Sequence, residues 1–313
     1  LHATPEEAIK ETEQQLETYA DLCENYLAMP VVRGCKTDKE KFAGAERTYT
    51  IECMMHDHKA LQSGTSHYFG DGFARAFGIT FSDKENKPAI PHQTSWGLST
   101  RIIGGIIMTH GDNNGLVLPP QVAPIQVIVI PVASHKPGVT EKADELIARL
   151  KAAGLRVRGD FSDNSPGWKF AQYEMKGVPL RVEIGPKDIE AGHCVAVRRD
   201  NGEKIVVPLE ELEARIPELL GDVQKGMYEK ARKNLDEHTY TATTLDEVKA
   251  IAEKENGGFI KTMWCGDLAC EMAMKEKAGV SSRCIPFEQE HVGDVCPVCG
   301  KPATKMVVWG VAY

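Results

Sequence analysis

The sequence predicts a multidomain protein that combines the α/β and α+β classes. Its 313 residues, 42% of them hydrophobic, are enough for two or three domains that each bury a core. Between residues 126 and 198, short apolar stretches alternate with helical ones, which is typical of a small α/β domain with a parallel or mixed sheet. Five of the nine cysteines lie in the last 49 residues, which indicates a metal-binding region at that end of the chain.

The N-terminal part begins with an amphipathic helix that we predict over residues 4–29. Thr4 can cap it, Pro5 suits its first position, Glu7 completes a capping box, and Pro30 ends it. Beyond it we predict strands over 48–53 and 78–81, and an apolar strand or helix over 97–111. A boundary is expected at the Leu-Pro-Pro run of residues 118–120.

Beyond this boundary the predicted strands and helices alternate. We expect strands over 126–132, 156–160, 180–184 and 194–198, with helices over 140–153 and 166–176. The segment 209–238 is helical and charged, so we predict an exposed connector. The last part should contain helices over 245–255 and 267–277 and strands over 258–264 and 306–313.

Charge and hydropathy exclude some classes of protein. A formal net charge of -8 excludes a globally basic nucleic-acid binder, although not a local basic patch. No apolar run approaches the ~20 residues of a membrane span. We find no signal peptide, and with an odd number of cysteines this predicts a reducing cytoplasm. The chain begins at a leucine, so we expect it to be part of a longer protein.

Two polar segments are candidate ligand sites. Residues 62–67, Gln-Ser-Gly-Thr-Ser-His, form either a surface turn or part of a site. Arg101 stands beside an apolar run and needs an anionic partner, because burying an unpaired guanidinium is costly. A carboxylate or a ligand phosphate could be that partner. His56 and His58 flank Asp57 in an expected loop, and we predict that both are surface residues.

Residues 149–199 are locally basic. Ten basic and six acidic residues give this stretch a charge of +4 in a chain of charge -8. Trp168, Phe170 and Tyr173 lie within it. Cations interleaved with aromatic rings suit single-stranded RNA, whose bases stack and whose phosphates pair. A solvated face over ordinary core aromatics is the alternative.

The late cysteines have the spacing of a zinc site. Cys265 and Cys270 are separated from Cys296 and Cys299 by 25 residues, and a glycine follows the second pair, as in a zinc knuckle. Four thiolates complete a tetrahedral shell, so we predict one structural zinc ion. Cys284 is the spare thiol, and we expect it to be a packing residue.

Several segments together resemble prolyl-tRNA synthetase of the archaeal and eukaryotic-like type. The similarity lies in Lys41-Phe-Ala-Gly44, in residues 62–67, in Thr94-Ser-Trp-Gly-Leu-Ser-Thr-Arg101 and in the run from Gly111 to Pro120. Residues 165–170 and 176–186 resemble that family's anticodon-binding domain, and the cysteine pairs with the terminal Tyr313 resemble its C-terminal appendix. The similarity covers nearly the whole chain in the same order.

The resemblance implies a domain plan and an activity. It implies the later half of a class II catalytic core on an antiparallel sheet (1–122, with motif 3), an α/β anticodon-binding domain (123–224) and a small α+β zinc-binding C-terminal domain (225–313). The implied enzyme is a proline–tRNA ligase. It would join L-proline and ATP, with Mg²⁺, into prolyl-adenylate and transfer proline to tRNA(Pro), as a cytoplasmic homodimer that binds neither membrane nor DNA.

The resemblance also assigns roles to individual residues. ATP would contact Gln62, Thr65, Ser99 and the catalytic Arg101; proline would contact Phe42, His67, Ser95 and Trp96; tRNA would contact Trp168, Lys169, Lys176 and Arg181; and zinc would be held by Cys265, Cys270, Cys296 and Cys299. Motif 1 and most of motif 2 would precede Leu1, so we expect the chain alone to be inactive. The alternatives are a threonyl, glycyl or histidyl synthetase, or a non-catalytic tRNA-binding paralogue.

Overall fold

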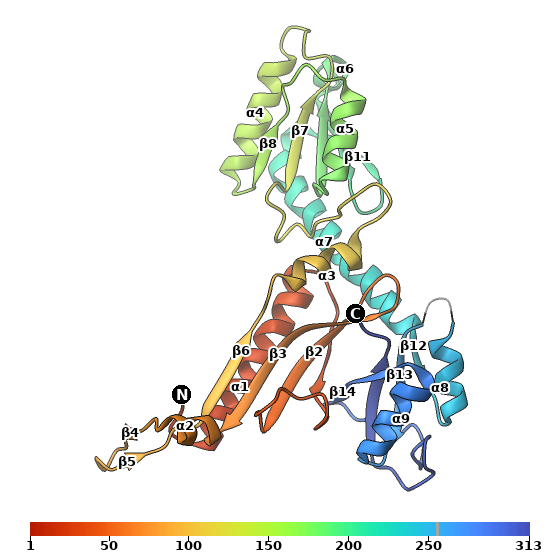
Figure 1. Ribbon diagram of the computed structural model, residues 1–313. Helices are drawn as coiled ribbons and strands as arrows, with labels where there is room; N and C mark the ends of the chain where they lie inside the picture. Colours follow the sequence, from red (N-terminus) through yellow and green to blue (C-terminus); the bar gives the residue numbers. More distant parts are fainter. Residues whose placement is uncertain (255–256) are drawn as a thin grey trace. The chain divides into compact units, whose positions relative to one another are not determined.

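The computed structural model describes residues 1–254 and 257–313 and confirms the predicted mixture of α/β and α+β architecture (Figure 1). These residues form two compact units. The first contains residues 1–25, 29–109 and 232–313, and the second contains 26–28 and 110–231. The end of the predicted 245–255 helix lies outside the described residues. Among the described helices, none has the length and apolar character of a bilayer span.

The first unit is built on an eight-stranded sheet with the order β12-β13-β15-β14-β1-β2-β3-β6. Because β1 pairs with β2 on one side and with β14 on the other, this sheet runs from the N-terminal part of the chain into the C-terminal part. The division into domains 1–122, 123–224 and 225–313 stays a prediction. The strands are β1 (Val32–Cys35), β2 (Arg47–Met54), β3 (Ala60–Gly70), β6 (Gln93–Gly97), β12 (Thr239–Thr241), β13 (Phe259–Trp264), β14 (Ser281–Pro286) and β15 (Lys305–Gly310).

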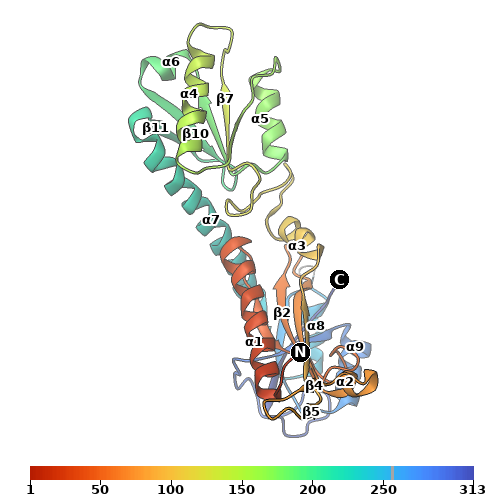
Figure 2. The ribbon, with the colours of Figure 1, turned by 90° about the vertical axis from the view of Figure 1, so that its left-hand side faces the viewer.

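Helix α1 (Pro5–Asp21) begins as predicted. The Thr4 hydroxyl accepts the Glu7 amide at 3.2 Å, and the Glu7 carboxylate accepts the amide of Ala3 at 3.0 Å. A π-helical turn, Leu22–Tyr26, continues it. The helix lies along β2, β3 and β6 (Figure 2) and buries a stripe that includes Leu16 and Tyr19. The unit also contains α2 (Gly72–Phe77), α8 (Leu245–Ala252), α9 (Leu268–Ala278), the hairpin β4 (Phe81–Ser82) and β5 (Pro88–Ala89), and most of α3 (Arg101–His110).

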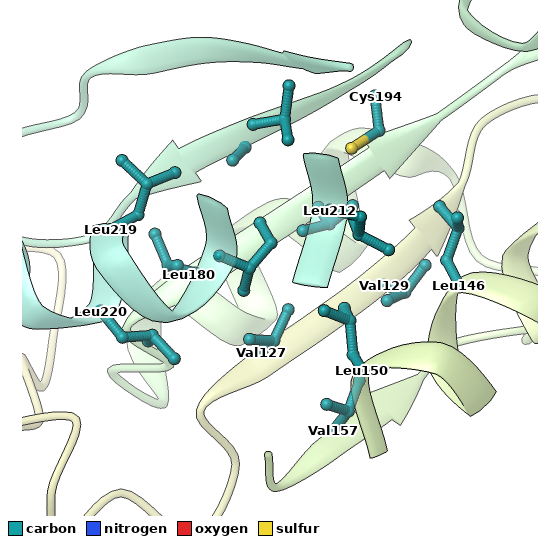
Figure 3. Close-up of a cluster of buried hydrophobic side chains, with 14 of the residues drawn as sticks. Val127, Val129, Leu146, Leu150, Val157, Leu180, Cys194, Leu212, Leu219 and Leu220 are labelled. Atoms are coloured by element: carbon teal, nitrogen blue, oxygen red, sulfur yellow. The ribbon is translucent and has the colours of Figure 1, made fainter. Parts of the chain in front are cut away.

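The second unit is a five-stranded sheet of order β11-β10-β9-β7-β8, as the alternation of residues 126–198 predicts. β7 is parallel to β8 and β9, whereas β10 is antiparallel to β9 and β11. Val127, Leu146, Leu180 and Leu212 meet in its core (Figure 3). The elements are β7 (Val127–Pro131), α4 (Val139–Ala152), β8 (Val157–Gly159), α5 (Pro166–Met175), β9 (Leu180–Ile184), α6 (Pro186–Glu190), β10 (His193–Arg198), β11 (Lys204–Pro208), a 3₁₀ turn (Leu209–Glu211) and most of α7 (Leu212–Glu237), whose residues from 232 onward belong to the first unit.

Three expectations about local structure are wrong. The charged helix α7 is not an exposed connector, because Leu212, Ile216 and Val223 are fully buried in the core of the second unit. The strand predicted over 78–81 begins only at its last residue: Gly78 ends α2 with φ +65°, and the strand β4 is Phe81–Ser82. His58 is buried, because its ring stacks on another histidine, although His56 is exposed as expected. Within the apolar stretch 97–111, for which a strand or a helix was expected, Gly97 ends β6 and residues 101–110 form the helix α3.

A buried ion network joins the N-terminal and C-terminal strands that meet in the middle of the large sheet. The Glu52 carboxylate on β2 is fully buried, and it accepts a bond from Lys36 Nζ at 2.7 Å and from Arg283 Nη2 at 2.8 Å. Arg283 lies on β14, so one carboxylate connects residues far apart in the sequence. Removing a partner from a buried ion pair leaves an uncompensated charge, so the three groups depend on each other.

Candidate active site, nucleic-acid interface and metal centre

Strands β2, β3 and β6 place three predicted ligand-binding residues on one face of the sheet. Residues opposite each other in antiparallel strands share a face, and residues two apart in a strand do as well. Thr48, His67 and Ser95 pair across the three strands, and Thr65 lies two residues from His67. Thr65, His67 and Ser95 therefore point to the same side.

The first half of β3, the end of β6 and the start of α3 line a hollow of about 360 Å³. Arg101, the first residue of α3, lies at its edge, with Nη1 3.5 Å from the Gln62 carbonyl and its amide 3.3 Å from Ser99 Oγ. Arg101 is exposed and has no carboxylate partner among the described residues. A helix N-terminus with an unpaired guanidinium attracts anions. The lining residues are Gln62, Ser63, Gly64, Thr65, Gly97, Leu98, Ser99 and Arg101.

His67 lies beside this hollow in a partly buried position. Its Nδ1 is 3.0 Å from Thr48 Oγ1, and its Nε2 is 3.1 Å from Thr65 Oγ1. Burial lowers the pKa of His67, which favours the neutral imidazole. The Phe42 ring is 5.1 Å from the imidazole and 54% exposed, so an apolar wall borders the histidine.

The geometry does not bring Trp96 to this group. Trp96 pairs with Ser66, whose side chain points to the opposite face from its neighbour His67. That face is the one covered by α1, since a Cβ at Gly64 would lie 3.1 Å from the Tyr19 ring. The resemblance assigns Trp96 to the proline pocket together with Ser95, whereas strand alternation turns these two side chains to opposite faces of the sheet.

The basic stretch, residues 149–199, contributes to a second hollow of about 430 Å³ in the second unit, which we call the basic hollow. Arg181 stacks on the Phe170 ring at 4.1 Å, and its Nε donates to Glu183 at 2.8 Å. The neighbouring Arg198 is held by Asp200 in two hydrogen bonds. The lining residues are Asp112, Asn114, Tyr173, Glu174, Val178, Arg181, Val197, Arg198, Arg199, Asp200, Asn201, Gly202 and Lys204.

The four predicted tRNA-binding residues differ in accessibility. Trp168 is 50% exposed, and the exposed Lys176 lies over the Tyr173 ring. Lys169, by contrast, is only 2% exposed, and its Nζ donates to the Asp160 carbonyl at 3.0 Å. A lysine buried in this way supports the loop before α5 and does not reach a phosphate, so we leave it out of the interface below.

Arg199 and Asp112 form a two-armed ion pair beside this hollow, with bonds of 2.6 and 2.7 Å. Arg199 lowers the pKa of Asp112 from 3.8 to about 2. A depressed carboxylate pKa stabilises the fold above the unfolded-state pKa, and this contribution is lost as the pH falls towards the folded-state pKa. Because 42% of the Asp112 side chain is exposed, we expect about 1 kcal/mol rather than the full value of the shift.

Asp112→Asn is therefore expected to destabilise the protein by about 1 kcal/mol at pH 7. The difference from the wild type should shrink as the pH falls from about 4 through the folded-state pKa of about 2, at which half of the wild-type carboxylates are protonated. Urea unfolding at several pH values measures it, with exposed Asp163→Asn as the control. A difference that does not change with pH would show that the ion pair is not its source.

The four predicted metal ligands converge in the first unit. The sulfur atoms of Cys265, Cys270, Cys296 and Cys299 all lie within 4.8 Å of one another. The Cys299 and Cys265 sulfurs are 3.7 Å apart, close to the ~3.8 Å expected for two ligands in a tetrahedron with 2.3 Å zinc–sulfur bonds. All nine cysteines are free thiols.

The local backbone explains how the two cysteine pairs meet. Cys265 follows β13, and Cys270 lies in the first turn of α9. Cys296 and Cys299 flank a tight turn in which the Cys296 amide donates to the Lys301 carbonyl at 2.8 Å and Gly300 has φ +72°. The Lys301 amide lowers the pKa of Cys299 to about 7, which favours a thiolate. This donor set fits a tetrahedral metal ion.

Comparisons with known proteins identify the family of this chain. An anticodon-binding domain family matches residues 126–219, and the C-terminal family of prolyl-tRNA synthetase matches residues 245–313. Proline–tRNA ligases of Lachnospira eligens and Clostridium novyi are 62% and 61% identical over 312 residues. A crystal structure of Cryptosporidium parvum prolyl-tRNA synthetase with L-proline and AMP is 40% identical, with a TM-score of 0.94 over 100% of this chain and 68% of that one.

The chain belongs to the prolyl-tRNA synthetase family. The alignments to the Lachnospira eligens and Clostridium novyi enzymes include 100% of this chain. They include 65% of the length of each of those two enzymes. The match to the anticodon-binding domain, residues 126–219, falls in the second unit, which contains the basic hollow. The C-terminal match contains the four clustered cysteines.

Two residues of this prolyl-tRNA synthetase chain were missed by sequence reasoning. Thr48 holds His67, and Lys204, an exposed residue at the start of β11, lines the basic hollow. The sequence did contain a signal for Thr48. In the strand β2, Thr48 and Thr50 alternate with Tyr49 and Ile51, so the two threonines share one face, and that face is buried as well. Lys204 had none, since only the pairing of β10 with β11 brings it to the hollow.

Proposed function

We propose that this protein is a proline–tRNA ligase, which activates L-proline with ATP and transfers it to tRNA(Pro). The observation that carries the proposal is the meeting of Arg101, Gln62 and Thr65 around one hollow, with His67 and Phe42 beside it, in a chain of the prolyl-tRNA synthetase family. The Cryptosporidium relative binds proline and AMP, which are the two parts of the proposed intermediate.

In the first step, a carboxylate oxygen of proline attacks the α-phosphorus of ATP. A new phosphorus–oxygen bond forms, the bond to the bridging oxygen breaks, and pyrophosphate leaves with the electron pair. Arg101 neutralises charge on the phosphates, because its guanidinium is already in place and needs no rearrangement. Gln62, Thr65 and Ser99 position the nucleotide, and positioning supplies much of the acceleration of such a displacement.

In the second step, a terminal ribose hydroxyl of tRNA attacks the proline carbonyl carbon. An ester bond forms, AMP leaves through its phosphate oxygen, and the hydroxyl proton passes to solvent or to the leaving group. Proline would lie in a pocket bordered by Phe42, His67 and Ser95. Trp96 is left out of this pocket because it projects from the other face of the sheet.

Mg²⁺ is the expected companion of ATP, but the lining of the hollow in the described part of the chain contains no carboxylate for it. Carboxylates are the usual protein contacts of Mg²⁺, and none lines the hollow in the described part of the chain. We therefore assign no residue to Mg²⁺ and no step to it. Cytoplasmic location and a homodimer are also proposals that rest on family membership alone, and light scattering on the purified protein tests the dimer.

Amino-acid-dependent ATP–pyrophosphate exchange by the full-length protein tests the proposed function. We expect exchange with proline and none with threonine, glycine or histidine. Exchange with one of those three would identify a sister synthetase. No exchange with any amino acid, together with retained tRNA binding, would favour the non-catalytic paralogue.

We further propose that the basic hollow of the second unit binds the anticodon of tRNA(Pro), which ends in two guanines. An arginine can bond both acceptors on the major-groove edge of guanine. Among the described contacts of Arg181, the hydrogen bond to Glu183 uses Nε, which leaves the terminal amino groups for a base. Stacking on Phe170 fixes the guanidinium in advance, and Lys204 adds a charge in the lining of the hollow. Exposed Trp168 and Lys176 lie in α5 and at its C-terminal end, on the same helix as Phe170.

Arg181→Ala is expected to raise the tRNA KM about tenfold and to leave amino-acid activation unchanged, since one base contact is worth about 1–3 kcal/mol. The effect should disappear on a tRNA whose anticodon guanines are replaced. Lys225→Glu, an exposed change on α7 in the same unit, is the matched control. If charge reversal at none of the accessible basic residues alters tRNA charging, the stretch is only a solvated face.

A further inference from the structure

A chain of hydrogen bonds leads from the protein interior to the hollow beside Arg101. The backbone amide of Phe42 donates to Thr48 Oγ1 at 3.1 Å. Thr48 Oγ1 is 3.0 Å from His67 Nδ1, and His67 Nε2 is 3.1 Å from Thr65 Oγ1. Thr65 lines the hollow, whereas Thr48 is 2% exposed and away from solvent. The chain therefore has one buried end and one end at the ligand site.

The direction of these hydrogen bonds follows from the buried end. Thr48 Oγ1 already accepts the Phe42 amide, and its own hydrogen needs an acceptor because an unpaired buried hydroxyl is costly. Within the described residues, His67 Nδ1 is the acceptor in reach. Thr48 therefore donates to Nδ1, and the neutral imidazole carries its hydrogen on Nε2. Nε2 then donates to Thr65 Oγ1, which leaves the Thr65 hydrogen free to point into the hollow.

The surroundings of His67 favour this neutral form. Phe42 and Phe69 lie 5.1 and 5.9 Å from its ring, and burial lowers the pKa of the imidazole. An imidazolium would donate from both nitrogens, and the buried Thr48 hydroxyl would then lose its acceptor. The opposite neutral tautomer has the same defect, and it would turn the lone pairs of Thr65, rather than its hydrogen, towards the ligand.

We propose that Thr48 is a positioning residue that fixes the tautomer of His67 and thereby makes Thr65 a hydrogen-bond donor to the ligand. The group that Thr65 meets must then be an acceptor, such as a phosphate or acyl oxygen. Under the proposed function, this acceptor is an oxygen of the prolyl-adenylate. Only this identification of the acceptor rests on the proposed function. Thr48 contacts no ligand itself and acts through His67.

The direct test is nitrogen NMR of the full-length protein labelled with ¹⁵N-histidine, with the His67 signals identified by their loss in His67→Gln. We expect the Nε2–H tautomer in the wild type and in Thr48→Ser, which keeps the hydroxyl. Thr48→Val has no hydrogen to donate, so a population with hydrogen on Nδ1 should appear. A wild-type His67 that carries its hydrogen on Nδ1, or a tautomer that Thr48→Val leaves unchanged, overturns the proposal.

Kinetics supply a second readout. Thr48→Val is expected to lower kcat/KM for proline-dependent exchange about tenfold, the scale of one lost hydrogen bond, while Thr48→Ser stays within about twofold. In a Thr65→Val background, Thr48→Val should add no further loss, because its effect passes through Thr65. Fully additive losses would contradict the relay.

Thr12→Val is the matched control for stability. Thr12 is also a fully buried threonine of the first unit, and its hydroxyl donates to the Ala8 carbonyl at 2.8 Å within α1, in a helix that covers the opposite face of the sheet. It should lower the melting temperature as Thr48→Val does without changing the His67 signals. If the protein activates no proline, the proposed function fails, and the NMR result still decides whether the relay exists.

Discussion

Arg101→Ala is expected to reduce proline-dependent ATP–pyrophosphate exchange by ~100-fold or more, the scale for losing a preorganised charge contact in a transition state. The guanidinium stands at the first residue of α3 and at the edge of the hollow. It has no carboxylate partner within the described residues, so a structural ion pair does not explain its position. The loss should appear in kcat, because the charge on the phosphates grows during the displacement.

The control for this prediction is Arg215→Ala, which removes an arginine paired with Glu218 on α7 and should leave exchange unchanged. His67→Ala gives a useful contrast, because it should act mainly through the proline KM. Wild-type exchange by Arg101→Ala would rule out the phosphate role, and an unchanged proline KM in His67→Ala would count against a place for that residue in the proline pocket.

Removing the metal is expected to have the largest effect on stability. We predict one zinc ion per chain, bound by Cys265, Cys270, Cys296 and Cys299 in a closed, structural shell. Zinc binding to such sites contributes on the order of 10 kcal/mol to folding. The knuckle lies between β14 and β15, and β14 also pairs with β1, so loosening it should disturb the sheet that carries the active site.

Elemental analysis of protein purified without chelator measures the stoichiometry. Cys296→Ser should lose the zinc, lower the melting temperature and reduce exchange indirectly. Cys284→Ala is the matched control: Cys284 is fully buried in the same unit, as expected for a packing residue, and lies outside the cluster, so zinc should be retained. A metal-free, fully folded protein with four reduced thiols would contradict the claim.

Most helices and the small α/β sheet could be predicted because their signals are local. Thr4, Pro5 and Glu7 mark the start of α1 through contacts within one turn, and strands such as β7 are continuous apolar runs. The candidate metal-binding cysteines were recognisable for the same reason, since the members of each pair lie within a few residues of each other. The strands β1 and β14 were missed, because they contain charged residues whose burial depends on partners elsewhere in the chain.

The amino-acid sequence by itself determined the family, the candidate nucleotide-binding residues and the candidate metal-binding cysteines, because these are carried by residue types at fixed spacings. Only the tertiary structure decided which side chains meet. Strand alternation removed Trp96 from His67, burial removed Lys169 from the basic surface, and packing made the charged α7 part of a core. Thr48 became a partner of His67 only through the register of β2 with β3, a long-range pairing that no local pattern of residues encodes.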